Sequence, residues 1–244
     1  MLIGTIANVG AVLVGSAVGA VAGARFPERF RETIMAALGL LTITIGIRET
    51  LATEEFVLVL GALLLGALIG EALRIEYGLQ RLGETLQRRF TGGYGELEID
   101  VDAPETTRPR GRHAGFAEGF VIASLVFCVG PLTIVGAIED GLGNPDLLLL
   151  KAGLDGFASI AFASVYGWGV ATSAFTIITI QGGIALAAGA LDGVLTDPML
   201  DALGAAGGIL LIGIALRLLD LKKIRVANLL PAIVLAPLFV KLWG

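Results

Sequence analysis

Long runs of apolar residues, separated by short polar segments, dominate the chain. A helix that crosses a bilayer needs about 20 apolar residues, with a range of roughly 17 to 25. Eight stretches meet this requirement and predict eight transmembrane helices: 2–24, 33–51, 55–74, 115–138, 147–167, 170–192, 201–219 and 225–243. The predicted fold class is therefore an all-α membrane protein.

The apolar run at 147–192 is too long for one helix, and we divide it at Tyr166-Gly167-Trp168-Gly169. Two glycines permit a turn there, and aromatic residues favour the membrane–water interface. Without this division the chain would have seven spans.

Composition agrees with a membrane protein. Of the 244 residues, 55% are hydrophobic and 16% are charged, and the mean hydropathy is +0.85. A soluble domain carries about 25% charged residues. The single cysteine, Cys128, excludes an internal disulfide, and the single histidine, His113, excludes a histidine-rich metal site. No polar stretch is long enough for a soluble catalytic domain or a nucleic-acid-binding domain.

Arginine and lysine gather in alternate loops. The loops at 25–31, 74–112 and 217–225 contain 14 of the 17 basic residues. Basic loops face the cytoplasm, so we expect a multi-pass protein of the cytoplasmic (inner) membrane with both termini outside. A seven-span chain would place the basic loop at 217–225 outside, which favours the eight-span arrangement.

The longest loop begins with "EYGLQRLGETLQRRF", in which leucines recur at helical spacing among charges. This pattern predicts a short interfacial helix, followed by a flexible polar segment. A plain connector and a regulatory segment are both open as its role. The chain then divides into four parts: spans 1–3 at 1–75, the loop at 76–113, spans 4–5 at 114–169 and spans 6–8 at 170–244.

Two parts of the chain are similar to each other in the same order. "TIANVGAVLVGSAVG" from Thr5 resembles "TIITIQGGIALAAG" from Thr176, and each has an amide, Asn8 or Gln181, near glycine. Two similar pairs follow at nearly equal offsets: 37–47 with 205–215, and 60–68 with 230–238. Since spans 1–3 and 6–8 run in opposite predicted directions, they predict an inverted 3+3 repeat, a device of secondary transporters. Chance similarity between low-complexity apolar segments is the alternative.

Asp155 is predicted to lie near the middle of the bilayer, in the fifth span. A carboxylate there costs roughly 2.5 kcal/mol or more, so it must be protonated, paired or in contact with water. Lys151 is four residues earlier on the same helix face and can pair with it. Two interpretations stay open: a structural ion pair, or a site for a substrate or proton.

Other polar and small residues in the spans also have two interpretations. Asn8 and Gln181 either bridge helices or contribute to a shared central site. Most intramembrane hydroxyls are expected to bond a carbonyl of their own helix; they belong to Ser124, Thr133, Ser159, Ser164, Ser173 and Thr179. A face with glycine at every fourth position predicts close helix packing, within the chain or in a homodimer; it consists of Gly15, Gly19 and Gly23.

The fourth span contains Gly130-Pro131 near the middle of the membrane. Proline removes a backbone donor and glycine weakens a helix further. The sequence therefore predicts either a kink or a broken helix whose free carbonyls and N–H groups bind a charged group. Ser124 and Thr133 flank this point. Pro231 and Pro237 suggest a second interruption, in the last span.

Several of these motifs together resemble a known family. "FVIASLVFCVGPLTIVGAIEDGL", "LLKAGLDGFASIAFAS" and "QGGIALAAG" are similar to segments of the YqgA/YdfK-like integral membrane proteins of prokaryotes. This family is catalogued as a domain of unknown function. The resemblance implies a multispan inner-membrane protein with a role related to transport, and it assigns no substrate and no site residues.

The sequence favours a small ion or solute transporter or channel. Its midplane site would contain Asp155, Lys151, Asn8, Gln181 and the Gly130-Pro131 break, with Ser124 and Thr133 beside it. The alternative is a non-transporting scaffold or a subunit of a larger membrane complex. No catalytic motif is present, so we expect neither an enzyme nor a cofactor or metal site. The expected partners are the bilayer, the cargo and, in one arrangement, a second copy, but not nucleic acid.

Overall fold

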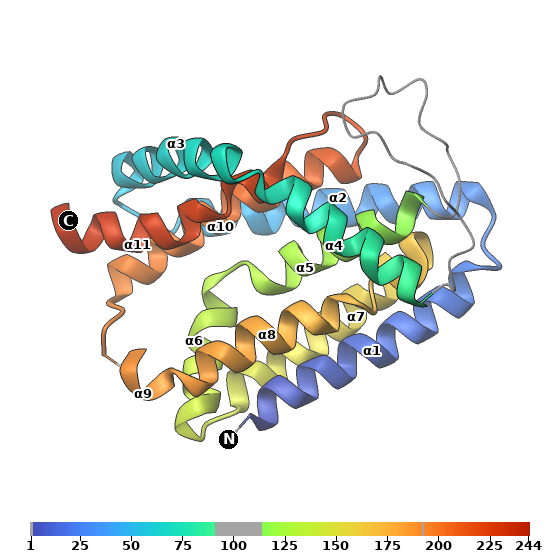
Figure 1. Ribbon diagram of the computed structural model, residues 1–244, viewed down its shortest axis with the longest axis horizontal. Helices are drawn as coiled ribbons and strands as arrows, with labels where there is room; N and C mark the ends of the chain where they lie inside the picture. Colours follow the sequence, from blue (N-terminus) through green and yellow to red (C-terminus); the bar gives the residue numbers. More distant parts are fainter. Residues whose placement is uncertain (1, 91–113, 192) are drawn as a thin grey trace.

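The computed structural model describes residues 2–90, 114–191 and 193–244, which fold into α-helices with two 3₁₀ turns (Figure 1). In chain order the elements are α1 (Ile3–Gly23), α2 (Glu28–Thr50), α3 (Phe56–Leu73), α4 (Ile75–Phe90), α5 (Ala114–Cys128), α6 (Pro131–Leu142), α7 (Asp146–Tyr166), η2 (Gly167–Gly169), α8 (Ser173–Leu186), α9 (Ala188–Leu191), α10 (Asp197–Leu218), η3 (Val226–Leu229) and α11 (Pro231–Trp243). The predicted all-α membrane fold is confirmed.

Six helices of the described ranges are long and apolar enough to cross a membrane. The bent pair α5 and α6 makes a seventh if the two helices are counted as one span, and α8 is a shorter apolar helix. The predicted division of the 147–192 run is confirmed, because η2 separates α7 from α8 and Gly167 has a φ of 69°. The count of eight spans and the inverted repeat stay predictions.

The charged segment after α3 forms α4, as its leucine spacing predicts. Leu79 and Leu86 pack against the main hydrophobic core, while Arg81, Arg88 and Arg89 are exposed. The polar remainder of this loop, at 91–113, lies outside the described residues. In Figure 1 both chain ends lie in the left half of the view, away from the α1–α2 connection at the right.

The glycine face of α1 packs against α7. A Cβ added to Gly19 would collide with the backbone of Ile160, and one added to Gly23 would collide with the backbone of Ser164. Lipid tails are as apolar as leucine, so helices in a membrane associate largely through such close packing. The glycine face, for which the sequence left two uses open, serves contact within the chain.

Glycine also brings α2 against α10 and α3 against α11. A Cβ on Gly46 would lie 2.7 Å from the carbonyl oxygen of Gly208, and a Cβ on Gly66 would lie 2.6 Å from the backbone nitrogen of Ala232. Residues of α10 enter both hydrophobic clusters, one shared with α1, α5, α7 and α8, the other with α3 and α11. α10 therefore joins the two parts of the bundle.

The α1–α7 contact predicts a position-dependent cost of adding volume to α1. Gly19→Leu should lower the thermal unfolding temperature of the detergent-purified protein, because overpacking costs about 1–3 kcal/mol. Gly10→Leu is the matched control on the same helix, since no atom lies within 4 Å of a Cβ there. Equal unfolding temperatures for the two variants would contradict the observed packing.

Candidate functional site

The helix of the predicted fourth span is interrupted at the predicted position. α5 ends at Cys128, α6 begins at Pro131, and the two helix axes differ in direction by 67°. Gly130 has a φ of 136°, which favours glycine, and Pro131 occupies the first turn of α6, where its missing N–H costs nothing. A continuous kinked helix is excluded. The break leaves the last carbonyls of α5 without their usual helical partners.

The side chain of Lys151 satisfies one of these carbonyls. Its Nζ donates a hydrogen bond of 2.9 Å to the carbonyl oxygen of Phe127, near the end of α5. The hydroxyl of Thr133, in the first turn of α6, donates to the same oxygen over 3.2 Å. At the break, the cation that binds this carbonyl is supplied by the chain itself.

The same ammonium forms an ion pair with Asp155, one turn later on α7. Both residues are almost fully buried, with 6% of Lys151 and 8% of Asp155 exposed. Asp155 Oδ2 also accepts a hydrogen bond of 3.0 Å from Nδ2 of Asn8, on α1. The carboxylate therefore joins α7 to α1, while its lysine partner joins α7 to the break.

Gln181 extends the network to α8. Nδ2 of Asn8 donates a second hydrogen bond, of 3.2 Å, to Oε1 of Gln181, and both side chains are completely buried. The negative carboxylate of Asp155 requires Asn8 to present its Nδ2 group, because a reversed Asn8 would turn its oxygen towards a negative charge. Gln181 must then turn its own oxygen towards the same Nδ2 group. Asn8 Oδ1 and Gln181 Nε2 consequently have no hydrogen-bond partner among the described residues. The two amides that are matched in the proposed repeat are in direct contact.

Most of the predicted site residues thus form one connected group, which we call the midplane cluster: Asn8, Phe127, Thr133, Lys151, Asp155 and Gln181. Gly130 and Pro131 shape the break beside it. Ser124 does not join the cluster, because its hydroxyl pairs with that of Thr176 on α8 over 3.0 Å. Own-helix bonding is confirmed for Ser159, Ser164 and Thr179, whereas the hydroxyl of Ser173 donates to the carbonyl of Val170, in the turn before α8.

The charges of the midplane cluster balance. One ammonium and one carboxylate leave it with no net charge, which limits the cost of keeping it in an apolar interior. Two surface hollows, of about 470 and 260 Å³, lie elsewhere, and no residue of the cluster lines them. Within the described ranges no three His, Cys, Asp or Glu side chains are grouped so that they could hold a metal ion.

Sequence reasoning missed Asp140, which is 1% exposed at the end of α6. Its carboxylate accepts hydrogen bonds of 2.9 Å from the backbone nitrogens of Gly4 and Thr5 and from the hydroxyl of Thr5. It therefore caps the first turn of α1. A signal was present, because Leu2 cannot cap a helix and a donor-rich first turn needs an acceptor from elsewhere.

A second polar group, which we call the α4 cluster, was also missed as a unit. Oε1 of Glu76 accepts from Arg217 over 3.1 Å, and Oε2 accepts from the backbone nitrogen of Ala227 over 2.9 Å. Arg217 also donates to Glu118 over 3.0 Å, and Asn228 accepts from the backbone nitrogen of Glu76 over 2.8 Å. These bonds fix the start of α4 to α10 and η3.

The ion pair in the midplane cluster predicts opposite results for single and double substitutions. Lys151→Met should destabilise the protein by about 3–5 kcal/mol, because it leaves the Asp155 carboxylate buried without a counter-charge. The double variant Lys151→Met/Asp155→Leu should recover much of this loss, since apolar replacements of a whole buried pair are often tolerated. Denaturant unfolding in detergent measures both. If the double variant is no more stable than the single one, the pair is not the source of the loss.

Comparison with known proteins matches residues 3–241 to the family described as "Protein of unknown function (DUF554)". The uncharacterized protein YqgA of Escherichia coli K12 is 32% identical over 237 residues, covering 97% of this chain and 95% of that protein. The uncharacterized membrane protein YdfK of Bacillus subtilis 168 is 27% identical over 244 residues, covering 98% and 96%. No solved structure matches. Because the match spans nearly the whole chain, the resemblance in its motifs is confirmed: the protein belongs to the DUF554 family.

Proposed function

We propose that this membrane protein is a small transporter or channel of the cytoplasmic membrane, whose ion or solute passes through the midplane cluster. One observation carries the proposal: a buried ammonium bridges a carboxylate and the free end of a broken helix. Buried ion pairs often stabilise a protein no more than apolar residues of similar volume, so the presence of two charged groups here suggests a role beyond stability. Ionisable residues within membrane spans are rare and commonly mark ion or substrate pathways.

The break in the fourth span supports the same interpretation. Backbone at membrane depth departs from helical geometry where it is buried in protein or lines a water-filled cavity. In many transporters such breaks form the substrate site, because half-helix ends present carbonyl or N–H groups. In this protein the ammonium of Lys151 donates a hydrogen bond to the carbonyl of Phe127. The arrangement therefore resembles an occluded site in which a side chain holds the position of a cation.

Charge balance suggests how the site would work. Asp155 is the residue that would bind a cation or a proton, and Lys151 would either keep it ionised or exchange with the cargo. Movement of the ammonium away from Phe127 would free the carbonyl and leave Thr133 as its remaining partner. The contact between Asn8 and Gln181 places amides from both proposed repeats at this point. An inverted repeat of α1–α3 and α8–α11 would give alternating access around it.

Replacement of the carboxylate by its neutral isostere tests this function. Asp155→Asn should reduce flux in proteoliposomes to the level of empty vesicles for any ion or solute that the native protein carries, because the site loses its negative charge. Asp146→Asn, at the exposed start of α7, is the matched control and should retain native flux. Size-exclusion profiles establish that both variants are folded. Native-like flux in Asp155→Asn would refute the role of the carboxylate.

One observation favours a second candidate, a non-transporting scaffold or a subunit of a larger membrane complex. The charged groups of the midplane cluster already have partners within the chain, and neither surface hollow reaches them. A structural ion pair that holds α1, α5 and α7 together would have the same bonds. The two functions differ in whether water reaches Asp155.

Thiol accessibility separates the two candidates. Asp155→Cys in a Cys128→Ser background should react with a small membrane-impermeant thiol reagent if cargo and water pass the midplane cluster. A cysteine at the exposed position Leu154 gives the signal of a lipid-facing site, and one at exposed Asp146 gives that of a wet site. Reaction at the rate of the Asp146 control supports transport. A rate equal to that of the lipid-facing control supports the scaffold.

A further inference from the structure

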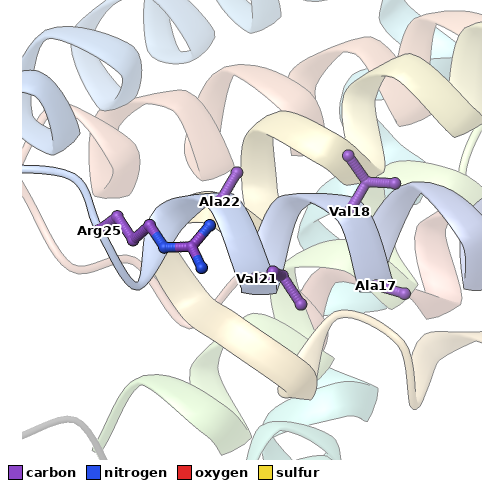
Figure 2. Close-up of a pocket in the computed structure, with 5 residues that line it drawn as sticks. All are labelled: Ala17, Val18, Val21, Ala22 and Arg25. Carbon is purple, nitrogen blue, oxygen red and sulfur yellow. The ribbon is translucent and has the colours of Figure 1, made fainter.

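The end of the bundle that carries the α1–α2 connection has two hollows on its outer surface. The first, of about 470 Å³, follows α1 and the residues after it (Figure 2). Figure 2 shows Arg25 where the helix ends, with small or branched apolar side chains along the helix before it. These lining residues are Ala17, Val18, Val21, Ala22 and Arg25. The hollow is thus an apolar strip with a cation at one end.

The second hollow, of about 260 Å³, lies between α1, α2 and α7 and also has apolar walls. It is lined by Ala22, Phe26, Ile34, Phe157, Ile160, Ala161 and Ser164. Ala22 belongs to both hollows, so they meet at the last turn of α1. Two apolar hollows of the surface therefore converge at a point that is followed in sequence by arginine.

Arg31 lies near the second hollow, although it does not line it. It lies one turn before Ile34 on α2, and its Nη2 donates to the carbonyl oxygen of Val165, the neighbour of Ser164. Its Nε is buried and has no hydrogen-bond partner among the described residues. A guanidinium has five donors in a planar fork that suits phosphate. Arg31 therefore places a half-buried cation beside an apolar hollow.

We propose that these two hollows bind one anionic phospholipid of the adjacent leaflet. Its two acyl chains lie in the two hollows, one along α1 and one between α1, α2 and α7. Its phosphate lies where the hollows meet, close to the guanidinium of Arg25 and to the neighbouring positive charge of Arg31. Basic pockets between membrane helices bind anionic lipid headgroups in this way.

Charge complementarity selects this occupant. Arg25 and Arg29 are exposed, and Arg31 is half-buried; because Glu28 and Glu32 lie among them, residues 25–32 have an excess of one positive charge. A zwitterionic lipid offers the same chains but no net charge. An apolar protein helix would cover the walls but would bring no negative charge to Arg25 and Arg31. A lipid satisfies both requirements with one molecule.

The bound lipid would join α2 to α7. Arg31 already reaches Val165 of α7, and Ile34 of α2 faces Phe157, Ile160 and Ala161 across the hollow. A chain that fills this space adds apolar contacts on both sides. The proposal concerns this surface alone and holds whether or not the midplane cluster carries cargo.

Native mass spectrometry of the detergent-purified protein tests the headgroup. With equimolar phosphatidylglycerol and phosphatidylcholine, the native chain should retain one phosphatidylglycerol several-fold more than phosphatidylcholine. Arg31→Gln should remove this preference, and Arg88→Gln, at an exposed position of α4, should keep it. Equal retention of the two lipids, or equal loss in the two variants, would overturn the proposal.

Filling the second hollow tests the acyl chain. Ala161→Phe should lower retention of phosphatidylglycerol several-fold, whereas Ala37→Phe, at an exposed position of α2, should retain it. Soluble glycerol 3-phosphate should not displace the lipid, because it has no chains for the hollows. Displacement by glycerol 3-phosphate would identify a simple phosphate site, and unchanged retention in Ala161→Phe would identify an ordinary annular lipid. Either result would refute the two-chain site.

Discussion

The Lys151 ammonium is the point on which the rest of this structure depends. It bonds the Phe127 carbonyl at the end of α5 and the Asp155 carboxylate on α7. It therefore satisfies a free carbonyl of one helix and neutralises the charge on another. Neither group could readily be buried alone, since an unpaired backbone oxygen and an unpaired carboxylate are both costly in an apolar interior. The break, the acid and the lysine therefore form one unit, and none of the three is independent of the others.

Close backbone packing surrounds this unit. The glycines of α1 allow α7 to approach so closely that Asn8 reaches Asp155 from one helix to the next. A single side-chain methyl group in that seam would separate the helices and lengthen this hydrogen bond. The small residues of α1 therefore set the spacing between α1 and α7 at which the polar side chains of the two helices can form a hydrogen bond.

The sequence predicts the fold and most of the midplane cluster for identifiable reasons. Gly130-Pro131 can be recognised because few residues break a helix, and Asp155 because few charges occur within an apolar span. Asn8 and Gln181 were found through their matched positions in two similar segments. The Phe127 carbonyl could not be predicted as the lysine's acceptor, since that requires the 67° bend to be known. Asp140, Glu76 and Arg217 lie at predicted span ends, where charges are ordinary, and only tertiary structure shows that they are buried or paired across helices.

α6 connects the two ends of this arrangement mechanically. At its start, Thr133 is tied to the carbonyl that Lys151 also holds; near its other end, Asp140 is tied to the first turn of α1. The helix has 12 residues, about 18 Å at 1.5 Å per residue, and a helix this short is stiff. Because hydrogen bonds hold both ends of α6, a displacement at the break would be transmitted along the helix to the first turn of α1.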